Sequence, residues 1–380
     1  MRKILIIFVG WQLMIAVFIA IGQRIIPATT NCVYTENFSS TVSRFLWNRA
    51  NFDGMHYISI SRNGYGPFQQ AFFPFYPDLI RWLNPLFGGL HLITGLAISW
   101  LSFFLSLIFF YKLLLLDYKQ KIVNRTIFYL LIFPTAFFFS AVYTESLFFF
   151  LVIAAFYFAR TKQWWLAGIL GLLASGTRLV GVFLFPALLY ELYYQLKVSK
   201  SVNSLALKIQ DNFYVLIREF SKLAIPIFLI PLGLLFYMLW LGVNYHDPLM
   251  FIHAQSDKII LLYQVCYRYL KMVATTRINP LYFTVWLELS TGLLFLFLTF
   301  WGIYKKTIRL SYLIFMVLAY LAPTTTGTFV SLPRFALLFF PGFIVLAHIE
   351  SKYFRLIYPI ISLILLLLAV SFFVQGYFVS

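Results

Sequence analysis

The chain has 380 residues, of which 62% are hydrophobic, 21% are aromatic and only 11% are charged. A soluble protein carries about a quarter charged residues, so this composition excludes an ordinary soluble domain and indicates an integral membrane protein. The net charge of +17 does not indicate nucleic-acid binding, because no soluble basic domain is present to carry it. Most lysines and arginines lie in short gaps between apolar runs, which is how positive-inside topology signals are distributed.

The first apolar run follows Met1-Arg2-Lys3 and extends to Ile21. It has no small-x-small cleavage site, so we expect an uncleaved first membrane helix rather than a signal peptide. The later apolar segments bring the expected total to about eleven membrane helices, several of them short and broken by proline. The expected spans are residues 4–21, 90–116, 124–140, 143–159, 164–177, 179–195, 223–243, 281–303, 311–323, 335–349 and 356–378.

Two long segments separate these spans, residues 22–89 and 244–280. A cytoplasmic N-terminus places both on the extracytoplasmic side and the short basic gaps in the cytoplasm. Loops this long within a compact bundle are usually functional. We therefore expect one all-α polytopic membrane domain over residues 1–380, with further helices in both loops. Cys32 and Cys266 fall in these loops. They either form a disulfide or remain two separate thiols, and the sequence does not choose between these alternatives.

The first long segment contains the strongest candidate for chemistry. Asp53 and His56 are three residues apart, which places them on one face of a helix. A carboxylate there can take a proton from an attacking hydroxyl, and a helix cap or an ion pair with Arg49 or Arg62 is the alternative. His56 either orients that carboxylate or binds a sugar or phosphate, against the alternative of a hydrogen-bonded packing residue.

Three more charged residues fall at the outer ends of their spans. Glu145 occupies a tight turn, where a carboxylate is costly unless it has a partner. Arg178 and Arg334 lie where the positive-inside rule makes basic residues uncommon. Guanidinium groups fork onto phosphate, so these arginines indicate a phosphate site, with contact to lipid headgroups as the alternative.

No metal site is predicted. The pair His246-Asp247 and the residue His253 have a loose metal-like spacing, but no further ligand is evident beside these two donor positions. Glu288 lies within a span and is expected to hydrogen-bond across helices. The chain also has no glycine-rich dinucleotide loop and no P-loop, so a nucleotide sugar or ATP is not expected as direct substrate.

Several stretches resemble one family in the same order along the chain. Residues 51–57, 63–65 and 71–77 resemble the WDxxHF…GY…AFFPxxP signature of GPI mannosyltransferase 2 (PIG-V) and its prokaryotic relatives. Residues 133–146 are similar to the NP…FFSAxYSES turn of that family, residues 174–181 to its ATGxRSNG segment, and residues 333–335 to its late (Q/P)RF element. Phe52 replaces the usual tryptophan, and Leu179-Val180 replace Ser-Asn, which leaves the donor sugar open between mannose and another sugar.

The resemblance implies a GT-C type glycosyltransferase. Such an enzyme is a polytopic helical bundle that moves a sugar, with mannose as the first expectation, from a polyprenyl- or dolichyl-phosphate-linked donor to an acceptor hydroxyl on the extracytoplasmic side, with inversion. Asp53 would be the general base, and Glu145 would position Asp53, Arg178 or the sugar. Arg178 and Arg334 would stabilise the departing lipid phosphate.

The same resemblance implies an aromatic wall made by Tyr65, Phe73 and Tyr76, with ordinary packing as the alternative for at least one of them. It implies no cofactor and no metal, because the lipid-linked sugar is a substrate and cationic side chains can stabilise its phosphate. The acceptor would be a glycolipid, a glycan or a protein, and an accessory membrane subunit stays open. The expected location is a bacterial or archaeal cytoplasmic membrane, or the ER membrane in a eukaryote.

The alternative from another functional class is a lipid or solute transporter or flippase without transferase activity. A transporter typically has charged or polar pairs at mid-membrane and broken helices in corresponding halves. In this sequence the ionisable residues gather at the outer ends of the spans, with Glu288 as the main exception. That distribution favours an enzyme.

Overall fold

The computed structural model describes residues 2–29, 42–203, 219–254, 262–277, 279–324 and 328–379. Within these ranges every regular element is a helix, which confirms the prediction of an all-α polytopic membrane protein. Helices are the expected solution for such an apolar chain, because they satisfy the backbone hydrogen bonds internally where no water is available.

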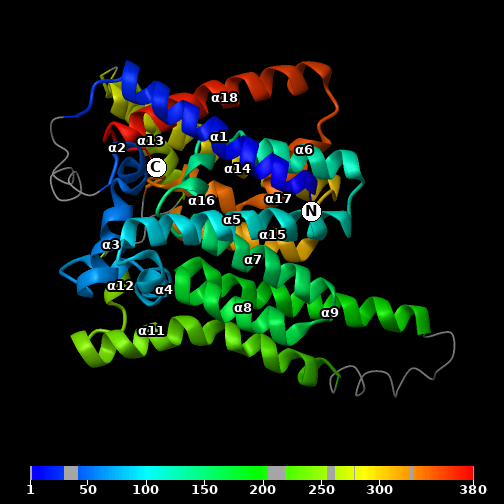
Figure 1. Ribbon diagram of the computed structural model, residues 1–380. Helices are drawn as coiled ribbons and strands as arrows, with labels where there is room; N and C mark the ends of the chain where they lie inside the picture. The colour runs from blue at the N-terminus through cyan, green and yellow to red at the C-terminus, as the bar shows by residue number, and fades with distance from the viewer. Residues whose placement is uncertain are drawn as a thin grey trace.

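The longer helices form a bundle in which α1 lies beside α18, α5 beside α7, and α8 beside α11 (Figure 1). The bundle helices are α1 (Arg2–Ile25), α5 (His91–Leu115), α6 (Gln120–Leu131), α7 (Glu145–Arg160), α8 (Trp164–Thr177), α9 (Leu184–Asn203), α11 (Ile230–Tyr245), α14 (Pro280–Lys305), α15 (Leu310–Thr324), α17 (Phe340–His348) and α18 (Lys352–Val374).

Shorter helices connect these elements and cover one end of the bundle. The short α-helices are α2 (Arg44–Trp47), α3 (Asp53–Asn63), α4 (Phe75–Leu83), α12 (Met250–His253), α13 (Leu262–Thr275) and α16 (Leu332–Phe335). Single 3-10 turns are η1 (Asn48–Ala50), η2 (Gln69–Ala71), η3 (Asn84–Phe87), η4 (Ala136–Ser140), η5 (Leu179–Phe183), η6 (Ile225–Leu229) and η7 (Ala336–Leu338).

Among the described residues, six helical segments are long and apolar enough to cross a membrane. They are α1, α5, α14, α18 and the segments Leu179–Val198 and Glu219–Tyr245. Two shorter apolar helices, α8 and α15, accompany them. The chain is therefore an integral membrane protein, and the expected number of about eleven spans stays a prediction.

Two of the expected spans, residues 124–140 and 335–349, are interrupted by non-helical residues. In residues 124–140, α6 ends at Leu131 and η4 begins only at Ala136. Pro134 lies between them, and proline lacks an amide donor and disfavours helical backbone at the residue before it. Residues 335–349 are divided in the same way, because Phe339 leaves the helical conformation and Pro341 starts the first turn of α17.

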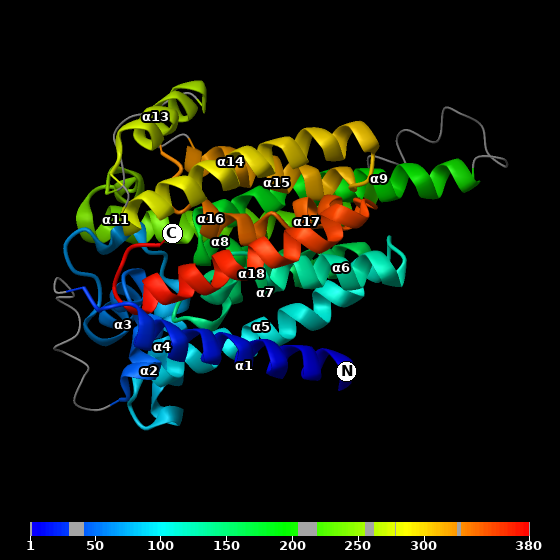
Figure 2. The ribbon, with the colours of Figure 1, turned by 90° about the horizontal axis from the view of Figure 1, so that it is seen from above.

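The two ends of the bundle differ. Figures 1 and 2 show α1 beginning at one end, which we call the N-terminal end, and α2, α3, α4 and α13 gathered at the other, which we call the loop end. The described parts of both long segments, 22–89 and 244–280, thus lie at the same end of the molecule. Cys32 lies outside the described residues, so its predicted alternatives with Cys266 stay predictions.

A cluster of buried charges joins four helices at the N-terminal end. Glu191 on α9 is fully buried and accepts hydrogen bonds from Arg309 Nε and Nη2, both at 2.8 Å. Arg160, the last residue of α7, pairs with Asp117 and lies 3.4 Å from Glu191. Each arginine has a carboxylate partner, so the cost of burying its charge is offset. The cluster fixes the ends of α5 and α7 and the middle of α9 relative to the start of α15.

Glycines allow α8 to approach its neighbours closely. A Cβ atom on Gly168 would lie 2.0 Å from the Pro226 carbonyl oxygen, and one on Gly233 would lie 2.2 Å from the Leu172 carbonyl oxygen. Small residues at such contacts are the usual means of packing membrane helices, since lipid supplies no hydrophobic force between them. The position of α8, which ends just before Arg178, therefore depends on these contacts.

Replacing Gly168 by alanine tests this packing. The added methyl group meets backbone rather than a flexible side chain, so Gly168→Ala is expected to lower stability by roughly 1–3 kcal/mol, as overpacking does. Gly10→Ala is the matched control, because no atom lies within 4 Å of its Cβ position. Thermal unfolding of the detergent-solubilised protein measures both, and equal midpoints for the two variants would refute the close approach.

Candidate functional site

Four charged side chains meet at the loop end, although they are far apart in the sequence. Asp53 is the first residue of α3, and Glu145 is the first residue of α7. Arg178 directly follows the last residue of α8, and Arg334 lies on α16. We call these four residues the charged quartet. The sequence singled out all four, and the structure brings them together.

The quartet forms a continuous chain of ion pairs. Arg178 Nη1 donates to Glu145 Oε1 at 2.6 Å. Arg334 Nε lies 3.1 Å from the same oxygen, an ion pair whose angle does not make it a hydrogen bond. Arg334 Nη1 in turn donates to Asp53 Oδ2 at 2.5 Å. Two positive and two negative charges therefore balance in the order Arg178, Glu145, Arg334, Asp53.

The four side chains differ in their access to solvent. The Glu145 side chain is 1% exposed, and those of Arg178 and Arg334 are 11% and 13% exposed, whereas that of Asp53 is 28% exposed. Burial lowers the pKa of the Arg334 guanidinium, but the carboxylates of Asp53 and Glu145 raise it, and the net shift is upward. Arg334 is thus held charged, and Asp53 is the member most open to a second molecule.

Helix ends also favour the charges of the quartet. Asp53 and Glu145 each occupy the first turn of a helix, where the partial positive charge of the helix N-terminus stabilises an anion. Arg178 lies at the C-terminal end of α8, where a cation is favoured. The helix starts and ends therefore support the same charge pattern as the ion pairs.

Aromatic rings cover the two arginines. The Arg178 guanidinium carbon lies 4.2 Å from the centre of the Phe335 ring. That of Arg334 lies 5.3 Å from the Tyr143 ring and 5.6 Å from the Phe138 ring. A guanidinium over an aromatic face gains a cation–π attraction and loses contact with water. These rings lie in the motifs of the sequence, but no role could be predicted for them. A cation–π contact between distant residues produces no recognisable spacing in the sequence.

Phe52, directly before Asp53, has an unusual backbone. Its φ is +58° and its ψ is −118°, a conformation that L residues with a large side chain rarely adopt. The ring packs against Phe373 and Phe378. Such strain persists where the surroundings fix it, and it is concentrated at functional sites. In this chain the strained residue sets the direction from which Asp53 enters α3.

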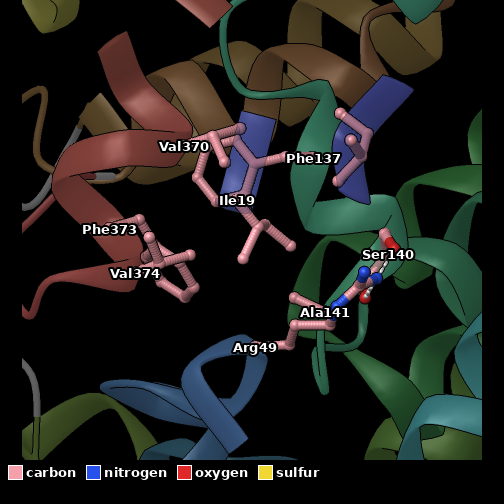
Figure 3. Close-up of a pocket in the computed structure, with 9 residues that line it drawn as sticks. Ile19, Arg49, Phe137, Ser140, Ala141, Val370, Phe373 and Val374 are labelled. Carbon is pink, nitrogen blue, oxygen red and sulfur yellow. Dashed lines mark hydrogen bonds between the residues drawn. The ribbon is translucent and has the colours of Figure 1, made fainter. Parts of the chain in front are cut away.

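A buried arginine anchors the segment that precedes Asp53. Arg49 is 5% exposed, donates to the hydroxyl of Ser140, and points with it toward a cavity of about 10 Å³ (Figure 3). The Arg49 carbonyl oxygen accepts a hydrogen bond from the Val142 amide at 3.0 Å. Burial lowers the pKa of Arg49 to about 10, so the guanidinium stays charged at neutral pH. These contacts attach the Asp53 segment to the turn that leads to Glu145.

The segment that carries Arg334 is anchored separately. The Thr135 hydroxyl donates to the Pro333 carbonyl at 2.6 Å. The Tyr269 hydroxyl, from α13, donates to Glu288 Oε2 at 2.6 Å and accepts the Phe329 amide at 3.1 Å. The expected hydrogen bond of Glu288 across helices is therefore present and joins α13 to α14. The bond from the Phe329 amide ties the second long segment to the residues before α16.

His56 lies one turn after Asp53 and does not contact the quartet. Its Nδ1 is 3.2 Å from the Gln69 side-chain nitrogen, and its ring stacks on Phe72 at 4.9 Å between centres. The ring is half-buried. The position leaves His56 near the Asp53 face of α3, so its predicted binding role stays a prediction.

The three aromatic residues expected to form a wall pack within the protein. Tyr76 is fully buried, with its hydroxyl near Ser99 and the Gly95 carbonyl. Phe73 is 5% exposed in a small apolar cluster, and the half-buried Tyr65 donates to the Phe72 carbonyl at 2.6 Å. The burial of Tyr76 and Phe73 agrees with the packing alternative, and the predicted substrate wall stays a prediction.

Within the described residues, no group of three or more His, Cys, Asp or Glu side chains is placed to hold a metal ion. His253 Nδ1 contacts Asp247 at 2.7 Å as an exposed pair. The charged quartet contains two carboxylates, but arginines occupy the space between them. That the protein has no metal site stays an expectation.

Neutralising Glu145 tests the quartet as a structural unit. Glu145→Gln keeps the size of the side chain but leaves two buried arginines with one carboxylate, and breaking a buried pair costs roughly 3–5 kcal/mol. We expect a clear fall in the unfolding midpoint in detergent. Asp247→Asn is the control, since it removes an exposed ion pair and should leave the midpoint unchanged. A fall of the same size in both variants would contradict the coupling.

One comparison with known proteins identifies the chain. A family model described as Mannosyltransferase (PIG-V) matches residues 4–246, which include Asp53, Glu145 and Arg178 but not Arg334. No curated protein and no solved structure matches the chain. The matched residues cover more than half of the sequence and contain the motifs around the site. The chain therefore belongs to the PIG-V mannosyltransferase family and is a membrane glycosyltransferase.

Proposed function

We propose that the protein transfers a hexose, with mannose as the first candidate, from a polyprenyl-phosphate-linked donor to an acceptor hydroxyl, with inversion. The observation that carries this proposal is the charged quartet, in which a chain of ion pairs links a partly exposed carboxylate to two arginines at one end of a membrane bundle. A base for the acceptor and cations for a lipid phosphate are the groups that this reaction requires.

Asp53 is the proposed general base. Its Oδ2 accepts from Arg334, and no described residue donates a hydrogen bond to its Oδ1. Oδ1 can therefore take the proton of the acceptor hydroxyl as the oxygen attacks the anomeric carbon. Arg334 holds the carboxylate in one orientation, which favours a productive geometry.

Arg178 is the proposed partner of the donor phosphate. Its contacts with Glu145 and Thr144 use Nη1 alone, so Nη2 and Nε have no partner among the described residues. These two nitrogens can fork onto phosphate oxygens. As the bond from the anomeric carbon to the phosphate oxygen breaks, the electron pair stays on the phosphate, and the guanidinium stabilises this charge.

Glu145 is the proposed positioning residue between the two functions. Its Oε1 accepts from Arg178 and pairs with Arg334, while Oε2 is buried without a hydrogen-bond partner among the described residues. It is too enclosed to meet an acceptor, so it orients the arginines and leaves proton transfer to Asp53. No metal or cofactor is needed in this scheme, because the arginines supply the positive charge.

The loop end is the proposed extracytoplasmic face. The short basic gaps of the sequence lie at the N-terminal end, which the positive-inside rule assigns to the cytoplasm. A polyprenyl donor then presents its sugar at the membrane surface beside the quartet. The acceptor is a hydroxyl of a glycolipid, a glycan or a protein, and a bacterial or archaeal cytoplasmic membrane is the proposed location.

A transporter or flippase is the second candidate that the sequence raised. The two buried charge clusters lie at opposite ends of the bundle, at Glu145 and at Glu191. A transport pathway would instead place its charged groups near the midplane between repeated halves. Membership of a transferase family and this distribution of charge both favour catalysis.

Asp53→Asn tests the base. The amide keeps the size of the side chain but cannot take a proton, so turnover should fall by roughly 10²–10⁴-fold. Release of polyprenyl phosphate from radiolabelled polyprenyl-phosphate-mannose, with an envelope extract as acceptor source, measures the rate, and donor binding is measured in parallel. Asp78→Asn, on the neighbouring helix α4, is the control. Turnover at the parental rate in Asp53→Asn would remove Asp53 from the mechanism.

Arg178→Ala tests the phosphate contact. Loss of a charge-assisted forked contact is expected to weaken polyprenyl-phosphate binding by roughly 1.5–3 kcal/mol, about 10–150-fold in affinity. Arg178→Lys should recover only part of the loss, because an ammonium cannot fork onto two oxygens. Arg44→Ala, which removes a loop-end arginine outside the quartet, is the control. Unchanged phosphate binding in Arg178→Ala would place the phosphate elsewhere.

A further inference from the structure

A cavity of about 310 Å³ lies among α1, α5 and α6, near the N-terminal end and remote from the quartet. It is far larger than the space of a single water molecule, about 30 Å³ in the liquid. The side chains that line it are Lys3, Ile4, Ile7, Leu107, Tyr111, Asn124, Ile127, Phe128 and Leu131. One side is partly open, because Phe128 is 44% exposed.

The polar and apolar parts of this lining are separated along the bundle. Lys3 lies in the first turn of α1, Tyr111 near the end of α5, and Asn124 near the start of α6. All three therefore lie toward the N-terminal end. The remaining side chains are apolar and most lie farther along the helices, such as Ile7 and Leu131. The cavity thus has a polar mouth at the N-terminal end and an apolar wall deeper in the bundle. The order of polar and apolar parts matches the headgroup and acyl chains of a lipid in a bilayer.

The polar mouth has an unneutralised positive charge. Lys3 Nζ donates to Asn124 Oδ1 at 3.4 Å, and Gln120 donates to the same oxygen at 2.8 Å. No carboxylate of the described residues forms an ion pair with Lys3, whose ammonium has three donors. Lys3 therefore retains hydrogen-bonding capacity for an anion.

Further basic residues surround the mouth. Arg2 adjoins Lys3, and Lys119 and Lys121 are exposed where α6 begins. None of the three pairs with a described carboxylate, and the nearby Asp117 is already paired with Arg160. A basic pocket between membrane helices is the kind of site that binds anionic lipid headgroups.

Leu131, in the apolar part of the lining, also contacts α1. Trp11, which is 5% exposed, donates from Nε1 to the Leu131 carbonyl at 2.8 Å. This contact joins α1 to the last residue of α6. Water gains little against an apolar wall at this depth, because it finds too few polar partners. A hydrocarbon chain that enters from the open side makes van der Waals contact with these apolar side chains.

We propose that this cavity is a binding site for an anionic phospholipid. One acyl chain occupies the apolar part, and the phosphate accepts hydrogen bonds from Lys3 Nζ and the Asn124 amide. The site is separate from the transferase site, and the proposal does not depend on the catalytic assignment. The bound lipid fixes α1 against α5 and α6. It thereby holds the start of α1, the helix that leads to the first long segment.

Binding of lipid to the purified full-length protein tests both halves of the site. Native mass spectrometry in detergent compares phosphatidylglycerol with phosphatidylcholine of the same acyl chains. Lys3→Gln should weaken phosphatidylglycerol binding about fivefold, the effect of one basic side chain near an anionic headgroup. It should weaken phosphatidylcholine binding less, because the choline group already neutralises the phosphate of that lipid. Lys352→Gln is the matched control, because Lys352 begins α18 at the same end outside the cavity.

A second pair of variants tests the hydrocarbon part. Ile7→Trp fills the cavity and should reduce the amount of either lipid that stays bound. Ile6→Trp is the control, since Ile6 is 63% exposed on α1 and does not line the cavity. Equal binding of the two lipids to the parent protein, or binding unaffected by both Lys3→Gln and Ile7→Trp, would overturn the proposal. Tighter binding of polyprenyl phosphate than phosphatidylglycerol in the same cavity would also overturn it, by naming a different occupant.

Discussion

The chain of ion pairs from Arg178 through Glu145 and Arg334 to Asp53 is the interaction on which the site depends. A charge removed from water is costly unless a partner compensates it, and here each charge has one. The four residues come from α8, α7, α16 and α3, so their pairing fixes those helices at one end of the bundle. Their unequal exposure then separates their roles, because only Asp53 is appreciably open to an incoming molecule.

Hydrogen bonds hold the segments on which these charges lie. Arg49 and the Val142 amide attach the Asp53 segment to the turn before Glu145. Thr135 attaches that same turn to Pro333, next to Arg334. Tyr269 attaches the second long segment to the chain before α16. The geometry of the charged quartet is therefore supported by hydrogen bonds from several directions, and aromatic rings beneath the arginines limit the access of water.

Charged groups at both ends give the apolar bundle its register. The helix α7 begins with Glu145 in the quartet and ends with Arg160 in the Asp117–Glu191 cluster. Apolar side chains fill the length between these clusters, and glycines such as Gly168 allow close approach there. Van der Waals packing in lipid specifies position weakly, since lipid tails are as apolar as the side chains. The terminal ion pairs supply the positional specificity that packing lacks.

The sequence by itself determined the class of protein, the all-α fold, the membrane location and the family. Composition and short motifs suffice for these, because neither requires knowledge of contacts between distant residues. It also singled out Asp53 from its place in the first long segment on one helix face with His56, and Glu145, Arg178 and Arg334 from the unusual position of charge at span ends. Only the tertiary structure decided that these four form one chain, since their pairing crosses up to 281 residues of sequence. It also turned Phe73 and Tyr76 inward and gave Arg49 and Tyr269 their anchoring roles. Residue type fixes what a side chain can do, whereas long-range packing fixes what it meets.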